Sequence, residues 1–196
     1  CTVENGVGSA GSSRPRLKMY CVHISKTLIM VDILCETPDR FLLLPIRDEQ
    51  AWKYYQDAVA CFWTAQELDL THDRYEELQD GQKTVLNNVL AFFAAADGIV
   101  GENLATNFIP QVQCAEMRAF YSFQCAIETV HAQVYGELIQ TYVPESSAQS
   151  ELFHALERNP GVKSLGDWAL HWTDPACASF GERLVAFACV EGILFS

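Results

Sequence analysis

Residues 120–139, FYSFQCAIETVHAQVYGELI, decide the fold of this chain. Apolar side chains dominate the stretch, so it predicts a long helix within a core. Glu128, His131 and Tyr135 occupy positions i, i+3 and i+7, which share one face of a helix. A carboxylate among apolar neighbours is costly to bury as an ion unless a cation compensates it. The stretch therefore predicts a core helix that directs polar groups inward.

Glu128-x-x-His131 has the spacing of a metal-ligand unit. In ferritin-like di-iron and di-manganese proteins, Glu-x-x-His motifs project from helices into the interior of a bundle. The alternative is a partly exposed glutamate beside a hydrogen-bonded core histidine. Because the motif is short and common, its spacing alone does not decide between the two.

Two other apolar stretches each carry a single acid. Asp97 follows LAFFAAA, and Glu191 follows LVAFACV. Each acid alone is compatible with a helix end or with a side chain that reaches solvent. Together with Glu128 they would cluster three carboxylates, which would force one another to protonate unless divalent cations were bound. Oxygen-rich sites with one histidine per metal suit iron or manganese. We therefore predict a metal site formed by Asp97, Glu128, His131 and Glu191.

A second motif of the same spacing, Glu151-x-x-His154, tests this reasoning. Its neighbours are polar and its helix is short, so solvent can satisfy both groups, and we predict no metal there. The remaining histidines stand outside the acid-bearing helices and are expected to be surface or structural residues: His23, His72 and His171.

Composition excludes several classes of protein. The 196 residues are 49% hydrophobic and 19% charged, which is a globular composition. The net charge of −12 argues against a nucleic-acid partner and against an anionic membrane surface. Apolar runs are interrupted by Asp97 or Glu128 and are expected to fall short of a membrane span. The eight cysteines form no Cys-x-x-Cys, and no secretory signal is evident, so we expect reduced thiols and a cytoplasmic protein.

The chain is expected to fold as an all-α bundle of long helices. Residues 1–32 are rich in glycine and serine, are expected to be flexible and have no assigned function, whereas 33–196 form the domain. Residues 89–96 are apolar all round, which predicts burial on all sides, and Pro110 is expected to break their helix. The expected helices cover residues 48–63, 82–108, 113–142, 147–158, 162–173 and 181–196.

Four motifs, in this order, resemble the small, radical-generating subunit of class I ribonucleotide reductase, most closely its eukaryotic-type branch. They are FWTAQELD at 62–69, LAFFAAADGIV at 90–100, ETVHAQVY at 128–135 and GERLVAFACVEG at 181–192. The resemblance runs from about Arg40 to Ser196. It implies a ferritin-like fold with two iron ions, manganese being possible, and a homodimer that works with a large subunit on ribonucleotide reduction.

The resemblance also implies roles for single residues. Tyr135 would carry the tyrosyl radical, Trp63 would transfer electrons to the metal site, and Phe195 would line the radical pocket. The metal ligands would be Asp97, Glu128, His131 and Glu191. Without the resemblance, Tyr135 could be a core tyrosine with a hydrogen-bonded hydroxyl, and Trp63 a packing aromatic on an amphipathic helix.

Two other functions stay open at this point. One is a related ferritin-like di-metal oxidase, against which Tyr135 and Trp63 argue. The other is a non-catalytic helical interaction module. The family takes two further ligands from a second Glu-x-x-His on a later helix, and it binds the large subunit through a C-terminal tail. Because the sequence ends at Ser196 without these, we expect an incomplete chain that is inactive by itself.

Overall fold

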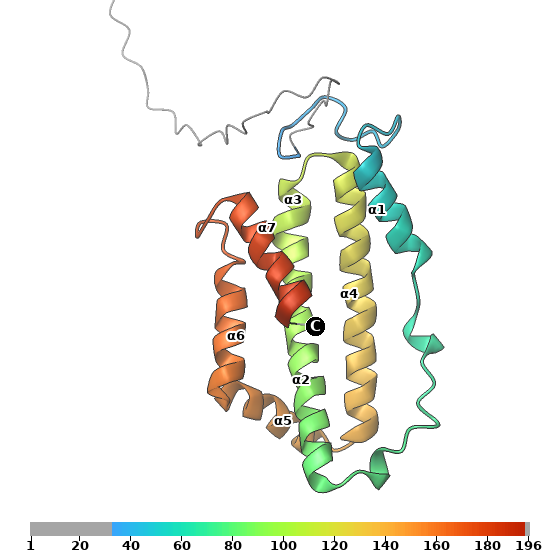
Figure 1. Cartoon of the computed structure of the whole chain (residues 1–196), viewed down its shortest axis with the longest axis vertical. Coiled ribbons are helices and arrows are strands. Elements are labelled where there is room, and N and C mark those ends of the chain that lie inside the picture. The colour runs from blue at the N-terminus through green and yellow to red at the C-terminus, as the bar shows by residue number, and fades with distance from the viewer. Residues whose placement is uncertain (1–32, 195–196) are drawn as a thin grey trace, which may run out of the picture. The chain divides into compact units, whose positions relative to one another are not determined.

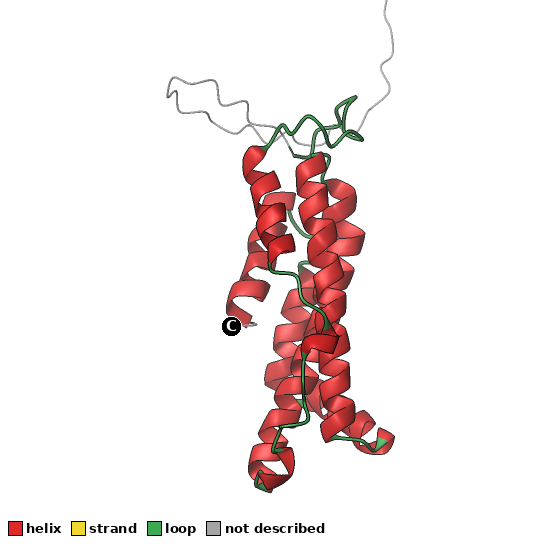
Figure 2. Cartoon of the chain, turned by 90° about the vertical axis from the view of Figure 1, so that its right-hand side faces the viewer, coloured by secondary structure: helices red, strands yellow, loops and turns green. Residues whose placement is uncertain are grey.

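The computed structural model describes residues 33–194, which belong to one compact unit, Val31–Ser196. Segment 1–32, which was expected to be flexible, and Phe195, which was expected to line the radical pocket, lie outside the described residues. Within the described part every regular element is helical, as Figures 1 and 2 show. The prediction of an all-α bundle is confirmed.

Two long helices form the centre of the bundle. Helix α2 covers Asp80–Asn103, helix α4 covers Ala115–Tyr142, and the two pack side by side (Figure 1). Apolar residues at one end of this pair form a buried core with others from later parts of the chain. Its fully enclosed side chains are Val100, Leu104, Phe108 and Val112. The core therefore fixes the spacing of α2 and α4, on which the predicted site lies.

Helix α1, Glu49–Ala60, packs against α4. Its N-cap is Asp48, whose Oδ1 accepts a hydrogen bond from the backbone N–H of Ala51 at 2.9 Å. The helix ends three residues before Trp63, so the prediction that it continues to that residue was wrong. Trp63 instead lies in the connection to a short 3₁₀ turn, η1 (Ala65–Glu67), and a second such turn, η2 (Tyr75–Glu77), precedes α2.

Proline 110 does not break the helical path of α2. The chain continues through a π-helical turn, η3 (Leu104–Phe108), into α3 (Ile109–Gln111), with Pro110 at the start of that last turn. In the π turn the N–H of Ile109 bonds to the carbonyl of Leu104, five residues earlier. A proline needs a local change in the hydrogen-bond ladder because it has no N–H and clashes with the preceding turn. The helical path therefore ends at Gln111, and the predicted break was wrong.

Helix α2 is apolar but is not buried on all sides. Leu90 and Ala91 are buried, whereas Val89 is 43% exposed and Ala95 is also exposed. The predicted burial of the whole stretch was therefore wrong. By length and composition, Asp80–Gln111 could cross a membrane, contrary to the expectation based on its internal acid. Core helices of water-soluble proteins meet the same criterion, and here α2 packs along α4 and carries the buried Asp97.

The remaining helices lie on the opposite side of α2 from α1 (Figure 1). Helices α5 and α6 pack against α2, and α7 crosses the upper half of the bundle. Capping fixes where α6 and α7 begin: Asn159 accepts from the backbone of the first turn of α6, and Ser179 forms a capping box with Glu182. Their bounds are Ser146–Arg158 for α5, Pro160–His171 for α6 and Phe180–Cys189 for α7, followed by a π-helical turn, η4 (Val190–Leu194).

Candidate metal centre

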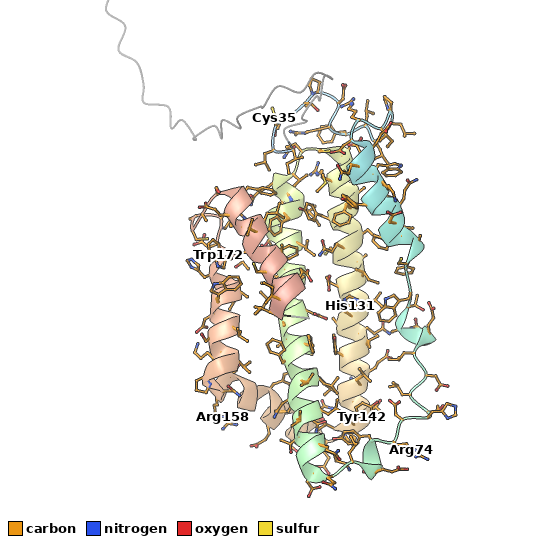
Figure 3. The ribbon with its side chains drawn as sticks, viewed as in Figure 1. Cys35, Arg74, His131, Tyr142, Arg158 and Trp172 are labelled. Carbon is orange, nitrogen blue, oxygen red and sulfur yellow. The ribbon has the colours of Figure 1, made fainter. Side chains whose placement is uncertain are left out.

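Three of the predicted ligands meet between α2 and α4. Asp97 projects from α2, and Glu128 and His131 from the middle of α4, where Figure 3 labels His131. One possible ligand atom from each of the three lies within 4.8 Å of the other two. Asp97 is 6% exposed and Glu128 is 8% exposed, while His131 is half-buried. The inward face predicted from the i, i+3 spacing is thus a buried cluster.

Glu128 and His131 also contact each other directly. The Nδ1 atom of His131 lies 2.9 Å from Oε2 of Glu128. This bond is the largest cause of a raised pKa of His131, and the negative charges of Asp97 and Glu191 add to it, against the effect of burial. In this geometry the imidazolium acts as a cation that partly balances the carboxylates.

Glu191 completes the set from a third direction. It lies in the π-helical turn η4, and its Oε1 accepts a hydrogen bond of 3.0 Å from Nε2 of Gln124. Gln124 stands one turn before Glu128 on α4, so the same helix orients both carboxylates. Single π turns are found frequently at functional sites. Glu191 is outside the tightest group, which contains Asp97, Glu128 and His131.

The electrostatics of the cluster favour a cation. Burial, followed by the charge of Glu128, raises the pKa of Asp97 to about 6. Burial, followed by the charges of Glu128 and Asp97, raises the pKa of Glu191 to about 7. The Oδ2 atom of Asp97 is buried without a hydrogen-bond partner. Carboxylate oxygens with one imidazole fit iron or manganese, and a divalent cation there would remove both the repulsion and the orphaned oxygen.

Tyr135 stands one helical turn beyond His131 on α4. Its ring stacks on that of Phe93, from α2, with centroids 5.6 Å apart and planes at 10°. Burial, then the charges of Asp97 and Glu128, raises the pKa of Tyr135. Among residues 33–194 its hydroxyl makes no hydrogen bond, so the alternative of a hydrogen-bonded core tyrosine is not what the described structure shows.

Trp63 reaches the cluster from the connection between α1 and η1. Its ring centroid is 5.7 Å from that of His131, with the planes inclined at 34°. The alternative of a packing residue on an amphipathic helix placed it wrongly, because the helix has already ended at Ala60. Its electron-transfer role stays a prediction.

The other polar residues considered in the sequence analysis lie away from the cluster or outside the described residues. Glu151 and His154 are exposed, as expected, and His154 faces Glu157, with Nδ1 3.4 Å from Oε2. Gln124 was missed by the sequence reasoning, although its position one turn before Glu128 in the same apolar stretch could have indicated it. His72 and His171 are exposed. The predicted His23 lies outside the described residues.

The chain is similar to known proteins over most of its length. Residues 40–196 match the family described as ribonucleotide reductase, small chain. A ribonucleoside-diphosphate reductase small chain from Nicotiana tabacum is 51% identical over 166 residues, which are 84% of this chain and 50% of that protein. Subunit M2 of the Danio rerio enzyme is 48% identical over 84% of this chain and 43% of its own length.

Solved structures of ribonucleotide reductase subunits are also similar to this chain. The Rnr4 homodimer of ribonucleotide reductase from Saccharomyces cerevisiae superposes with a TM-score of 0.74 at 34% identity, covering 82% of this chain and 52% of that one. A dimanganese protein, NrdF of Streptococcus sanguinis, has a TM-score of 0.67 at 20% identity and covers 76% of this chain and 53% of its own, which supports the fold alone. This chain spans about half the length of the relatives it matches. On the matched residues and the identity to these relatives, it belongs to the ribonucleotide reductase small-chain family.

Proposed function

We propose that this chain is the metal-binding and radical-generating part of a ribonucleoside-diphosphate reductase small subunit, which serves the conversion of ribonucleotides to deoxyribonucleotides. One observation carries the proposal. Asp97, Glu128 and His131 gather their ligand atoms within 4.8 Å, and Tyr135 follows one turn further along the same helix. Two of the predicted ligands and an oxidisable phenol are thereby held on one helix, α4, and the third ligand is supplied by the packed helix α2.

The metal site would hold a pair of ions. The residues of this chain that would hold them are Asp97, Glu128, His131 and Glu191, and the remaining ligands would come from elsewhere in a longer protein. The oxygen-rich donor set fits iron and equally fits manganese. A bound pair of such ions would supply the capacity to activate dioxygen and the oxidising power.

Tyr135 would give up one electron and its phenolic proton. A tyrosine is ordinarily protonated near neutral pH, and burial raises the pKa of Tyr135 further, so the neutral phenol is the form that would be oxidised. The parallel ring of Phe93 at 5.6 Å covers one face and excludes water and reductants from it. Trp63, against His131, is the aromatic side chain suited to deliver an electron to the site.

The partners follow from the family. The radical would be passed to a large subunit that holds the nucleotide, and the small subunits would form a homodimer, as the yeast relative does. The family match does not favour the two alternatives, another di-metal oxidase or a non-catalytic module. The described cysteines are all free thiols, which supports a cytoplasmic location: Cys35, Cys61, Cys114, Cys125, Cys177 and Cys189.

The test uses the longer protein that contains this segment. Metal-free protein is loaded with ferrous iron and exposed to dioxygen, and the tyrosyl radical is measured by electron paramagnetic resonance. Tyr135→Phe should abolish the signal, whereas Tyr142→Phe, a matched change at the end of the same helix, should keep it. A signal that survives in Tyr135→Phe would show that Tyr135 is not the radical site.

A further inference from the structure

A cavity of about 270 Å³ lies between α1 and α4. Its walls come from Ala58 on α1, from Cys61 and Phe62 just after it, and from Phe123 and Ile127 on α4. Cys61 and Phe62 are exposed, whereas the other three are partly buried, so the cavity leads inward from the surface.

Two further wall residues contact the metal-ligand set itself. Trp63 packs its ring 5.7 Å from the ring of His131, centroid to centroid. Gln124 donates from Nε2 to Oε1 of Glu191 at 3.0 Å. The inner wall of the cavity is therefore one side chain thick, and the predicted ligands lie on its far side.

The lining favours an apolar guest over water. Apart from the indole N–H of Trp63, its polar side chain is Gln124, whose amide is already bonded to Glu191. A buried water needs two to four polar partners, while apolar cavities of about 150 Å³ stay dry and take up benzene or xenon. Solvent reaches the mouth of the cavity at Cys61 and Phe62, but its volume of about 270 Å³ has room for such a guest, and its mostly apolar inner lining offers few side chains to order water. A small apolar gas fits both its size and its chemistry.

We propose that this cavity binds small apolar gases and that dioxygen enters the metal centre through it. The inference rests on the proposed function for its biological use, because a dioxygen-consuming site on the far side of the wall is what gives an apolar gas cavity a purpose. Trp63 and Gln124 form the partition that the gas must pass. The binding of gas itself depends only on the cavity and is independent of any metal.

The first test uses the metal-free chain and dioxygen as the probe. Dissolved dioxygen is paramagnetic, so it should enhance the nuclear relaxation of the Trp63 indole and Ile127 methyl signals. Ala58→Leu adds three carbon atoms to the wall, narrows the cavity and should reduce this enhancement. Ala60→Leu, the same change at an exposed position of α1 outside the cavity, should leave it intact. Circular dichroism checks that both variants fold.

A competition in the unsubstituted chain avoids any doubt about folding. Xenon occupies apolar cavities, so xenon pressure should reduce the dioxygen effect at Trp63 and Ile127. An enhancement that is absent in the unsubstituted chain, insensitive to xenon or unchanged in Ala58→Leu would overturn the proposal.

The second test uses the longer, iron-loaded protein and follows the rate at which the radical forms after mixing with dioxygen. Ala58→Leu should slow the dioxygen-dependent rate several-fold and leave the final radical yield unchanged, while Ala60→Leu should change neither. Equal rates in the two variants would show that dioxygen enters elsewhere. The absence of a radical in the unsubstituted protein would instead contradict the proposed function, so the two failures can be told apart.

Discussion

The chain contains Glu-x-x-His twice, on two helices with opposite surroundings. On α4, Glu128 is 8% exposed and its carboxylate bonds to His131 at 2.9 Å. On α5, Glu151 and His154 are both exposed, and His154 faces Glu157 instead of its motif partner. Identical spacing therefore gives a buried cluster in one place and two solvated side chains in the other.

The difference lies in what each helix packs against. Helix α4 packs along α2, which contributes a third acid, Asp97, to the same space. Confining several carboxylates in a space of low polarity raises their pKa values and creates a demand for a cation. Solvent meets that demand on α5. Whether Glu-x-x-His can act as a metal-ligand motif therefore depends on the helix against which it packs. The variants below compare the two motifs directly.

The largest expected difference is in metal affinity. Glu128→Gln in the metal-free chain should weaken Mn²⁺ binding by about 100-fold or more, since even partners outside the ligand set are worth about 10 to 100-fold. Glu151→Gln makes the same chemical change on α5 and should leave the affinity unaltered. The measurement is the free Mn²⁺ signal in electron paramagnetic resonance. Equal losses in both variants would remove the distinction between the two motifs.

The next effect is the pH dependence of stability. The pKa of Asp97 rises from 3.8 to about 6 on folding, so the folded state prefers the protonated acid. This contribution to the stability of the metal-free chain is then fully present below about pH 4 and is lost as pH rises through about 6. Glu191, with a pKa of about 7, extends the loss upward. The contribution of Asp97 is on the order of 3 kcal/mol, since one pKa unit corresponds to about 1.4 kcal/mol.

Urea unfolding at a series of pH values measures this dependence. Asp97→Asn should flatten it and Glu151→Gln should not. Saturating Mn²⁺ should reverse its sign, because ligands bind metal in their deprotonated form. A metal-free chain whose stability increases between pH 4 and 7 would contradict the proposed charge balance.

A smaller effect is expected at Gln124. Gln124→Leu removes the donor to Glu191 and should cost about 1 kcal/mol of unfolding free energy. That hydrogen bond lowers the pKa of Glu191, so its loss should move the pKa above about 7, as carboxyl ¹³C chemical shifts would show. Gln133→Leu, at an exposed position on α4, is the matched control and should change neither quantity. Equal effects of the two changes would mean that Gln124 does not support the site.

The smallest effect belongs to the exposed motif. His154→Ala should change the unfolding free energy by less than about 0.5 kcal/mol, as is usual for a surface position. His131→Ala should cost more, because it leaves the buried Glu128 without its partner. Chemical denaturation of both variants gives the comparison, and a similar cost for each would mean that burial does not separate them.

The periodicity of the sequence was enough for the helices and for the inward face of α4. It placed α4 within two residues at its start and correctly at its end, because its apolar stretch is long and proline follows. It failed where local hydrogen bonding overrides composition. The π turn before Pro110 keeps the helical path continuous, and the pattern of apolar and polar residues does not predict that turn.

The candidate site was also only partly predictable from the sequence. Lone acids in apolar stretches indicated Asp97, Glu128 and Glu191, but the same reasoning does not distinguish Glu116, which is 3% exposed. Burial acts to raise the pKa of Glu116, yet backbone donors led by the N–H of Arg47, at 2.7 Å, hold it below its usual value. Whether a buried acid meets N–H donors or other acids depends on tertiary packing, which one sequence does not display.

The π turn that carries Glu191 makes the site sensitive to the length of the chain as well as to its composition. A π turn can be viewed as an α-helix with one inserted residue. Deletion of Gly192 would remove the extra residue and let Val190–Leu194 return to ordinary α-helical winding, which would change the direction in which Glu191 projects from this turn. One residue that is not itself a predicted ligand would thus set how Glu191 is aimed relative to Asp97 and Glu128, although every predicted ligand was still present.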